Sequence, residues 1–178
     1  MGTIGQRVLM LLVRCCMATR TYETEALRVA WDTTLCIHTG ICLKLGDGVF
    51  DSQRHPWVDL TLASTDTVVA AVTACPSGAL TYERLDGEQG EQSAVPTTVV
   101  PWPNGPLLVR GAIEVSDRHG DIFTSAPRAA LCRCGSSSNQ PFCDLSHRDE
   151  GFKDYPRVHS QTRHSADSPA DISPTELE

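Results

Sequence analysis

The chain has 178 residues with 22 acidic and 15 basic side chains, a formal net charge of −7, and eight cysteines. A hydrophobic fraction of 40 % and a charged fraction of 21 % are typical of a globular protein and exclude a wholly disordered chain. The acidic balance argues against a nucleic-acid binder and against attraction to anionic membranes. Because only 6 % of the residues are aromatic, we expect thin cores that need further support, for which the cysteines are the obvious candidates.

Whether the cysteines form disulfides or bind metal depends on the cellular compartment, for which the amino-terminal residues are the relevant signal. The apolar run at residues 8–13 is shorter than a signal-peptide core and far too short to span a bilayer, and no clear cleavage site follows it. We therefore expect a cytoplasmic protein, in which thiols stay reduced and clustered cysteines bind metal more often than they form disulfides. Residues 1–21 are interpreted as an N-terminal extension, with Met17 as an alternative start; its Cys15 and Cys16 fall outside both motifs described below.

Residues 22–86 are expected to form a first small unit. Residues 25–31 alternate as a strand with one hydrophobic face, and residues 57–58 form a short strand. Ser64 is placed to cap a helix over residues 65–74, which carries an apolar stripe and ends before Pro76. Residues 79–83 then return as a strand.

Residues 87–105 are interpreted as a linker, because they are rich in Gly, Pro, Gln and Glu, with at most one short strand near residues 97–100. A second unit over residues 106–159 is expected to begin with strands at residues 107–110 and 112–115 on either side of Gly111. A turn then leads to a strand at residues 122–124. Residues 160–178 have the composition of a disordered tail.

Three cysteines and one histidine gather within sixteen residues of the second unit: Cys132, Cys134, Cys143 and His147. Asp144 is a good helix N-cap, and a helix starting there would let Cys143 and His147 face one side of a bound metal. Small and polar residues after Cys134 allow backbone N–H groups to approach the sulfurs. Zinc also accepts such ligands, but structural zinc sites favour C-x-x-C spacings, which Cys132 and Cys134 lack.

This segment resembles the CDGSH iron-sulfur domain, whose signature is C-x-C-x-x-[S/T]-x-x-x-P-x-C-D-G-[S/A/T]-H. The matching residues are Cys132, Cys134, Ser137, Pro141, Cys143, Asp144, Ser146 and His147, while Leu145 stands where the family has glycine. The resemblance implies a [2Fe-2S] cluster held by the three cysteines and His147, with Ser137, Asp144 and Ser146 supporting the ligands. It also implies that a homodimer is an option, since CDGSH relatives often form one.

Three further cysteines, Cys36, Cys42 and Cys75, have the form of a ferredoxin-type site in which the last cysteine precedes a proline. The regular spacing would place a fourth cysteine where Thr39 stands. A [3Fe-4S] cluster on thiolates alone, a [4Fe-4S] cluster completed by His38 or an exogenous ligand, and a site without a cluster all remain open. His38 could instead donate a hydrogen bond to a sulfur. Pattern and flanks resemble the divergent mono-cluster 4Fe-4S ferredoxin family over about residues 22–85.

The expected fold class is α+β, with a small ferredoxin-like unit followed by a β-rich CDGSH-type unit. The expected function is one-electron transfer or redox sensing, with His147 taking up a proton on reduction as a further hypothesis. A carrier that delivers clusters to other proteins and a zinc-stabilised interaction module are the alternatives. No nucleophile motif, P-loop or dinucleotide pattern is found, so we expect no enzyme. The expected partner is an unidentified redox protein or an apo-protein that accepts a cluster. We expect no binding to nucleic acid or to a membrane.

Overall fold

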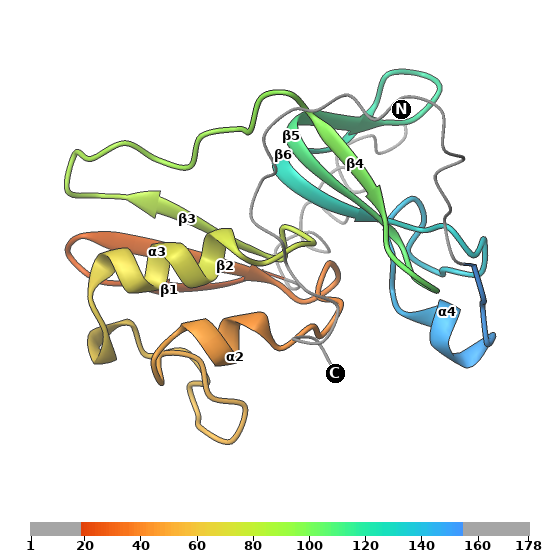
Figure 1. The fold of residues 1–178 in the computed structure, drawn as a ribbon. Helices are drawn as coiled ribbons and strands as arrows, with labels where there is room; N and C mark the ends of the chain where they lie inside the picture. The colour runs from red at the N-terminus through yellow and green to blue at the C-terminus, as the bar shows by residue number, and fades with distance from the viewer. Residues whose placement is uncertain (1–18, 155–178) are drawn as a thin grey trace, which may run out of the picture.

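Two antiparallel three-stranded sheets organise residues 19–154, the part of the chain that the computed structural model describes (Figure 1). The N-terminal unit (residues 19–86) holds the sheet with strand order β1-β2-β3, and the C-terminal unit (residues 98–154) holds the sheet with order β4-β5-β6. Residues 87–97, the connecting segment, join them. The linker is shorter than the predicted residues 87–105, because residues 98–101 pair as a strand of the second sheet. Residues 1–18 of the predicted extension and the predicted tail at residues 160–178 lie outside the described residues. Residues 19–21, which were expected to belong to the extension over residues 1–21, instead begin the first strand of the N-terminal sheet.

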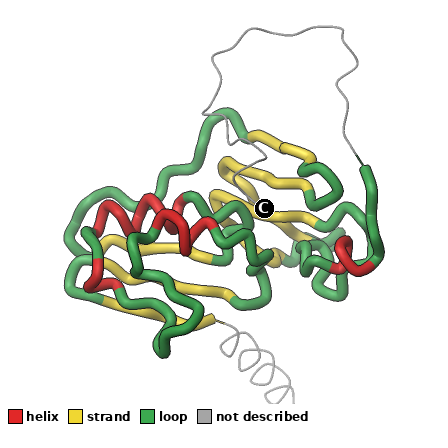
Figure 2. The backbone as a smooth tube through the Cα atoms, turned by 60° about the horizontal axis from the view of Figure 1, so that its bottom comes forward, coloured by secondary structure: helices red, strands yellow, loops and turns green. Residues whose placement is uncertain are grey.

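The N-terminal unit packs its helices against one face of its sheet (Figure 2). The strand at its centre follows the predicted alternation, since Leu27 and Val29 are 1 % and 0 % exposed in the core. Apolar residues of the long helix, Val68, Ala71 and Val72, join the same core. The elements are β1 (Thr19–Glu23), β2 (Leu27–Asp32), α2 (Ile41–Leu45), the 3₁₀ helix η1 (Leu60–Leu62), α3 (Thr65–Thr73) and β3 (Leu80–Arg84).

Helix α3 begins where the sequence predicts. The Ser64 side chain accepts a hydrogen bond from the backbone N–H of Thr67 at 3.2 Å, which is the expected N-cap. The helix ends at Thr73, one residue before the predicted end, so that Cys75 follows directly on its last turn. The residues predicted as a short strand at 57–58 form only an isolated bridge between Phe50 and Val58.

The C-terminal unit contains β4 (Thr98–Pro101), β5 (Leu107–Ser116), β6 (Ile122–Leu131) and the short helix α4 (Ser146–Asp149). The two strands predicted on either side of Gly111 are one strand, β5, with a register shift between Arg110 and Ile113. Gly111 has φ +146°, and a Cβ there would come within 2.4 Å of the Thr97 side-chain oxygen. Glycine therefore lets β5 continue through a bulge instead of ending.

Strand β6 is longer than predicted, because it continues past residue 124 to Leu131. Pro127 lies inside it, which is tolerated because β6 is an edge strand of its sheet. The extra length carries the chain directly to Cys132. Within residues 19–154, no helix is long and apolar enough to cross a membrane.

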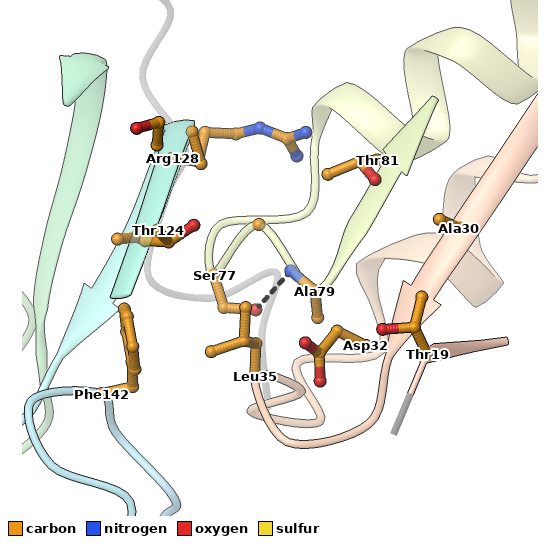
Figure 3. A pocket seen from close by; sticks show the side chains of 14 residues that line it. Thr19, Ala30, Asp32, Leu35, Ser77, Ala79, Thr81, Thr124, Arg128 and Phe142 are labelled. Carbon is orange, nitrogen blue, oxygen red and sulfur yellow. Dashed lines mark hydrogen bonds between the residues drawn. The ribbon is translucent and has the colours of Figure 1, made fainter. Parts of the chain in front are cut away.

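The two units contact one another along β6 and the loop that follows it. A cavity of about 200 Å³ lies between them, lined by Asp32, Ser77 and Thr81 of the N-terminal unit and by Thr124, Arg128 and Phe142 of the C-terminal unit (Figure 3). Ile37 is buried together with Ala130 and Cys143. The Asn139 side-chain amide donates a hydrogen bond to the Thr34 carbonyl at 2.9 Å. Loops that carry candidate metal ligands from both units therefore meet at this junction.

Candidate metal centres

The loop after β6 brings the four candidate ligands of the C-terminal unit together in two pairs. The Sγ atoms of Cys132 and Cys134 are 3.8 Å apart, and Cys143 Sγ lies 3.4 Å from Nδ1 of His147. Backbone hydrogen bonds from Cys132 to the Pro141 carbonyl and from Cys143 to the Ala130 carbonyl close the loop at its base. The loop therefore holds the two side chains of each pair at a short distance from one another.

The spacing within each pair matches two ligands on one tetrahedral metal ion. With metal–sulfur bonds of about 2.3 Å, two thiolates on one tetrahedral ion lie roughly 3.8 Å apart, and a thiolate and an imidazole lie slightly closer. Among residues 19–154, no three His, Cys, Asp or Glu side chains are near enough to one another to ligate a single metal ion. The structure thus brings the four side chains together as two close pairs.

Asp144 ties the ligand loop to the start of α4, although it is not the N-cap that the sequence predicts. Its Oδ1 accepts hydrogen bonds from the backbone N–H and hydroxyl of Ser146, and its Oδ2 accepts two from Ser138 at 2.8 Å. These hydrogen bonds, chiefly those from Ser146, hold the pKa of Asp144 well below its usual range. The Ser137 hydroxyl donates to the Phe142 carbonyl at 2.7 Å, next to Cys143.

The N-cap of α4 is Leu145, in a left-handed conformation with φ +76°. An Asx-type turn from Asp144 to Ser146 places this residue between them, and so the helix starts one residue later than the predicted cap requires. Leu145 also packs beside Ile37, Ala130 and Cys143. Its backbone conformation is one that glycine adopts without steric cost, which explains physically why a glycine fits this position of the signature.

The sulfurs and the imidazole of the C-terminal centre have unequal electrostatic surroundings. Burial raises the pKa of Cys132, but backbone N–H groups of Ser137 and Gly135, together with Cys134, outweigh it and leave that pKa lowered. Burial raises the pKa of Cys143 and lowers that of His147, which is 9 % exposed. The surroundings of Cys132 therefore favour the thiolate, whereas those of Cys143 favour the neutral thiol.

The N-terminal unit collects its three cysteines from three different elements. Cys36 lies in the loop after β2, Cys42 lies in α2, and Cys75 follows α3. Burial raises the pKa of Cys42 to about 11, and the neighbouring Cys75 and Cys36 thiolates add to the rise. The three sulfurs therefore lie close enough to repel one another as thiolates, which a bound cation would reverse. In a four-iron cluster each iron takes its own ligand, so these sulfurs need not meet at one ion.

His38 lies beside this centre but not at the distance that a separate iron would require. Its Nδ1 is 3.7 Å from Cys36 Sγ, a contact that fits a hydrogen bond to the sulfur. Ligands on two different irons of one cluster would lie further apart, because each points outward from its own iron. The contact favours the hydrogen-bonding role that the sequence also allowed, and ligation by His38 stays a prediction.

Three further residues lie around the centres; Arg133 stands out in the sequence because it lies between two candidate ligands, whereas Ser77 and Arg128 do not. The hydroxyl of Ser77 lies 3.7 Å from Cys75 Sγ, and the C-P-S-G turn is the sequence signal that could have indicated it. Arg133 donates to the carbonyls of Gly105 and Trp102 and pairs with Asp154, so it anchors the ligand loop instead of facing solvent. The third residue, Arg128, has no local sequence signal.

None of the six cysteines of the two motifs forms a disulfide within the described residues. A second cavity, of about 380 Å³, lies between the two ligand loops. Cys36 and His38 line it from the N-terminal unit, and Ser138, Asn139 and Asp144 line it from the C-terminal unit. The cavity therefore borders Cys36 and His38 on one side and the loop that precedes Cys143, together with Asp144, on the other, but none of the four C-terminal candidate ligands lines it.

Comparison with known proteins assigns both centres to iron-sulfur families. Residues 22–85 match the family model described as divergent 4Fe-4S mono-cluster, and residues 104–148 match the model described as iron-binding zinc finger CDGSH type. The Escherichia coli K12 protein "Uncharacterized protein YjdI" is 36 % identical over 63 residues, which are 35 % of this chain and 83 % of that protein. Its counterpart from E. coli O157:H7 matches equally well.

These matches define an iron-sulfur cluster protein. The chain belongs to the divergent 4Fe-4S mono-cluster family and carries a CDGSH-type domain after that unit. Its cofactors are iron-sulfur clusters, of the 4Fe-4S kind in the N-terminal unit and of the CDGSH kind in the C-terminal unit. The resemblances that the sequence suggested are thereby confirmed.

Proposed function

We propose that this protein is a one-electron carrier or redox sensor that holds a [2Fe-2S] cluster on Cys132, Cys134, Cys143 and His147. A second, ferredoxin-type cluster is held on Cys36, Cys42 and Cys75. The observation that carries the proposal is the division of the C-terminal ligands into two pairs, at 3.8 Å and 3.4 Å. A cluster with two irons needs two ligands on each iron, and this arrangement supplies them.

The chain's own residues prepare the C-terminal centre for that group. The cluster supplies reversible one-electron chemistry when bound. The N–H groups of Gly135 and Ser137 stabilise negative charge on Cys132, while Asp144 and Ser146 hold the turn that carries His147. Burial favours the neutral imidazole of His147, which is the form that ligates metal. These residues therefore orient the ligands and limit the cost of gathering thiolates.

The N-terminal unit supports a ferredoxin-like assignment through its two helices on one face of the sheet, with Cys42 in α2 and Cys75 after α3. Three thiolates suit a three-iron cluster or a four-iron cluster with one ligand from elsewhere. A zinc module would need all four C-terminal ligands around one ion, and the paired geometry disfavours it. We further propose a cytoplasmic, non-enzymatic protein with an unidentified redox protein as its partner.

Site variants with a matched control test the ligand sets. Cys134→Ser should remove the visible absorption and the reduced-state EPR signal of the [2Fe-2S] cluster, and Cys42→Ser should remove the signal of the other cluster. Cys16→Ser, a cysteine outside both motifs, should change neither. An unchanged spectrum in Cys134→Ser, or a colourless unsubstituted protein that contains zinc, would contradict the proposal.

Cluster delivery is the second candidate, and the mixed ligand set favours it. His147 is the one neutral ligand among three cysteines in the C-terminal centre, so its bond to iron is the easiest to exchange. Mixing the loaded protein with an apo-ferredoxin separates the two functions. Transfer of the chromophore to the acceptor supports a carrier, and retention with electron exchange supports an electron-transfer protein.

A further inference from the structure

Arg128 belongs to β6 of the C-terminal unit, but its side chain lies among backbone carbonyls of the N-terminal unit (Figure 3). It is 1 % exposed and is the largest fully buried side chain in the described residues. Nη1 donates to the carbonyls of Val72 and Cys75, both at 2.6 Å, and to that of Thr73 at 3.2 Å. Nη2 donates to the Leu80 carbonyl at 3.1 Å. One guanidinium thus binds the segment that carries the ligand Cys75 on both sides of that residue.

This contact adds hydrogen bonds to carbonyl groups at the end of α3. The last carbonyls of an α-helix have no partner in the regular helical ladder, and α3 ends at Thr73, two residues before Cys75. The Val72 carbonyl also accepts the Cys75 N–H at 3.0 Å. Arg110 of β5 adds two hydrogen bonds of 3.3 Å to the Thr73 carbonyl. Two arginines of the C-terminal unit therefore complete the end of a helix in the N-terminal unit.

The charge of Arg128 is compensated within the same junction. Glu91, in the connecting segment, accepts a hydrogen bond from Nη2 at 2.7 Å, and its side chain is only 11 % exposed. A buried arginine needs such a partner to offset its loss of hydration. The connecting segment therefore closes over the guanidinium and helps to hold it against the Cys75 segment.

The backbone of β6 also lies directly against the turn that follows Cys75. A Cβ at Gly78 would come within 2.5 Å of the Arg128 carbonyl oxygen, so this position accepts no larger residue while the units are docked. Side-chain hydrogen bonds and backbone contact therefore act on the same short turn, from Cys75 to Gly78.

We propose that Arg128 is a positioning residue for the N-terminal iron-sulfur centre. The C-terminal unit, through Arg128, holds Cys75 where the cluster needs it, so that this cluster is retained tightly only while the two units are docked. The inference rests on the proposed function, because it assumes that Cys75 ligates the cluster. It adds that one unit supplies part of the metal site of the other, which neither family match requires by itself.

The test uses full-length variants loaded anaerobically and challenged with an iron chelator. Arg128→Met removes the guanidinium. Gly78→Ala keeps the guanidinium but places a Cβ against the Arg128 carbonyl oxygen, at a residue with φ +72°. Gly87→Ala is the matched control, because Gly87 has a similar positive φ of +83° but open space around it. The readouts are the separate EPR signals of the two clusters over time and the thermal unfolding of each variant.

We expect the N-terminal signal to decay about tenfold faster in Arg128→Met and Gly78→Ala, as is typical when a residue supporting a metal ligand is removed. The C-terminal signal should persist at its original rate, and Gly87→Ala should match the unsubstituted chain. Equal acceleration at both centres would indicate general destabilisation and overturn the proposal, as would an unchanged N-terminal signal. Absence of the N-terminal cluster from the unsubstituted chain would instead contradict the proposed function.

Discussion

Leu145 has a backbone conformation that a side chain with a Cβ disfavours. It adopts φ +76° between Asp144 and Ser146, at the point where the ligand loop becomes α4. A left-handed conformation costs a residue with a Cβ about 1–2 kcal/mol relative to a right-handed one, and glycine escapes this cost. Packing beside Ile37 and Cys143 offsets part of this cost for leucine.

Comparison of Leu145→Gly with Leu145→Ala separates backbone strain from packing. Both substitutions remove the leucine packing, but only glycine relieves the conformation, so we expect Leu145→Gly to be the more stable by about 1 kcal/mol. Chemical denaturation of both variants measures the difference. An alanine variant as stable as the glycine variant would show that the position carries no strain.

The Asp144 carboxylate makes the stability of the C-terminal centre depend on pH. Because hydrogen bonds hold its folded pKa below the usual value, its ionised form contributes stability above about pH 4, and the contribution is lost as the pH falls towards the folded pKa. Asp144→Asn should therefore destabilise the protein at neutral pH by about 1 kcal/mol, since one acceptor oxygen is replaced by a donor. The difference from the unsubstituted chain should shrink below about pH 4.

Thermal unfolding at several pH values checks this prediction, with Asp149→Asn on the exposed side of α4 as the control. A difference between Asp144→Asn and the unsubstituted chain that stays constant from neutral to acid pH would contradict it.

The role of a residue can be predicted from the sequence when the residues that it works with are close along the chain. The candidate ligands from Cys132 to His147 lie within sixteen residues, so a spacing rule can identify them. Arg128 could not be identified in this way, because its partners are 37 to 56 residues away and are mostly backbone carbonyls, which carry no residue type. The sequence indicated that Asp144 supports the ligands, but it predicted the wrong role, that of a helix N-cap. The role depends on the left-handed backbone conformation of Leu145, and a leucine in the sequence does not indicate that conformation.

At the scale of elements, α3 was predicted to within one residue, because its cap and apolar stripe are local signals. Strand β6 was predicted too short, since Pro127 and small residues resemble a loop unless the edge position of the strand is known. The split of β5 at Gly111 was wrong for a related reason: a glycine bulge and a turn look alike in one sequence.

The N-cap of α3 provides a test at this scale, because α3 positions Cys75. Ser64→Ala removes the hydrogen bond to the Thr67 N–H and should lower the free energy of unfolding by about 1 kcal/mol. Ser52→Ala, at an exposed turn residue, is the matched control and should have little effect. Equal stability of the two variants in a denaturant titration would show that the cap is unimportant.

At the scale of the molecule, residues 19–154 form two small units that meet where the loops with the candidate metal ligands lie. The predicted location in the cytoplasm, the option of a homodimer and the redox partner remain predictions, because they concern other molecules and surroundings. The motifs do not indicate the contacts between the two units. In the structure, Ile37 is buried beside Cys143, and Arg128 donates hydrogen bonds to the segment that carries Cys75.

Because small units depend on bound metal for stability, removal of iron should destabilise both units. Calorimetry before and after anaerobic iron chelation should show a lower unfolding temperature for the apo-protein, with reconstitution restoring it. A control chain treated with chelator already saturated with iron excludes effects of the reagent. Identical unfolding with and without iron would mean that hydrophobic packing alone holds the units.

In the proposed [2Fe-2S] centre, Cys132 and Cys134 hold one iron, and Cys143 and His147 hold the other. Mössbauer spectroscopy tests this arrangement of ligands most directly. The protein is produced in cells supplied with the Mössbauer-active iron isotope and measured in its oxidised state. We predict that the [2Fe-2S] contribution consists of two distinct ferric doublets of equal area, one from the iron with sulfur ligands alone and one from the iron with the imidazole. A single doublet for two equivalent irons, or no iron bound at Cys132, Cys134, Cys143 and His147, would contradict the account.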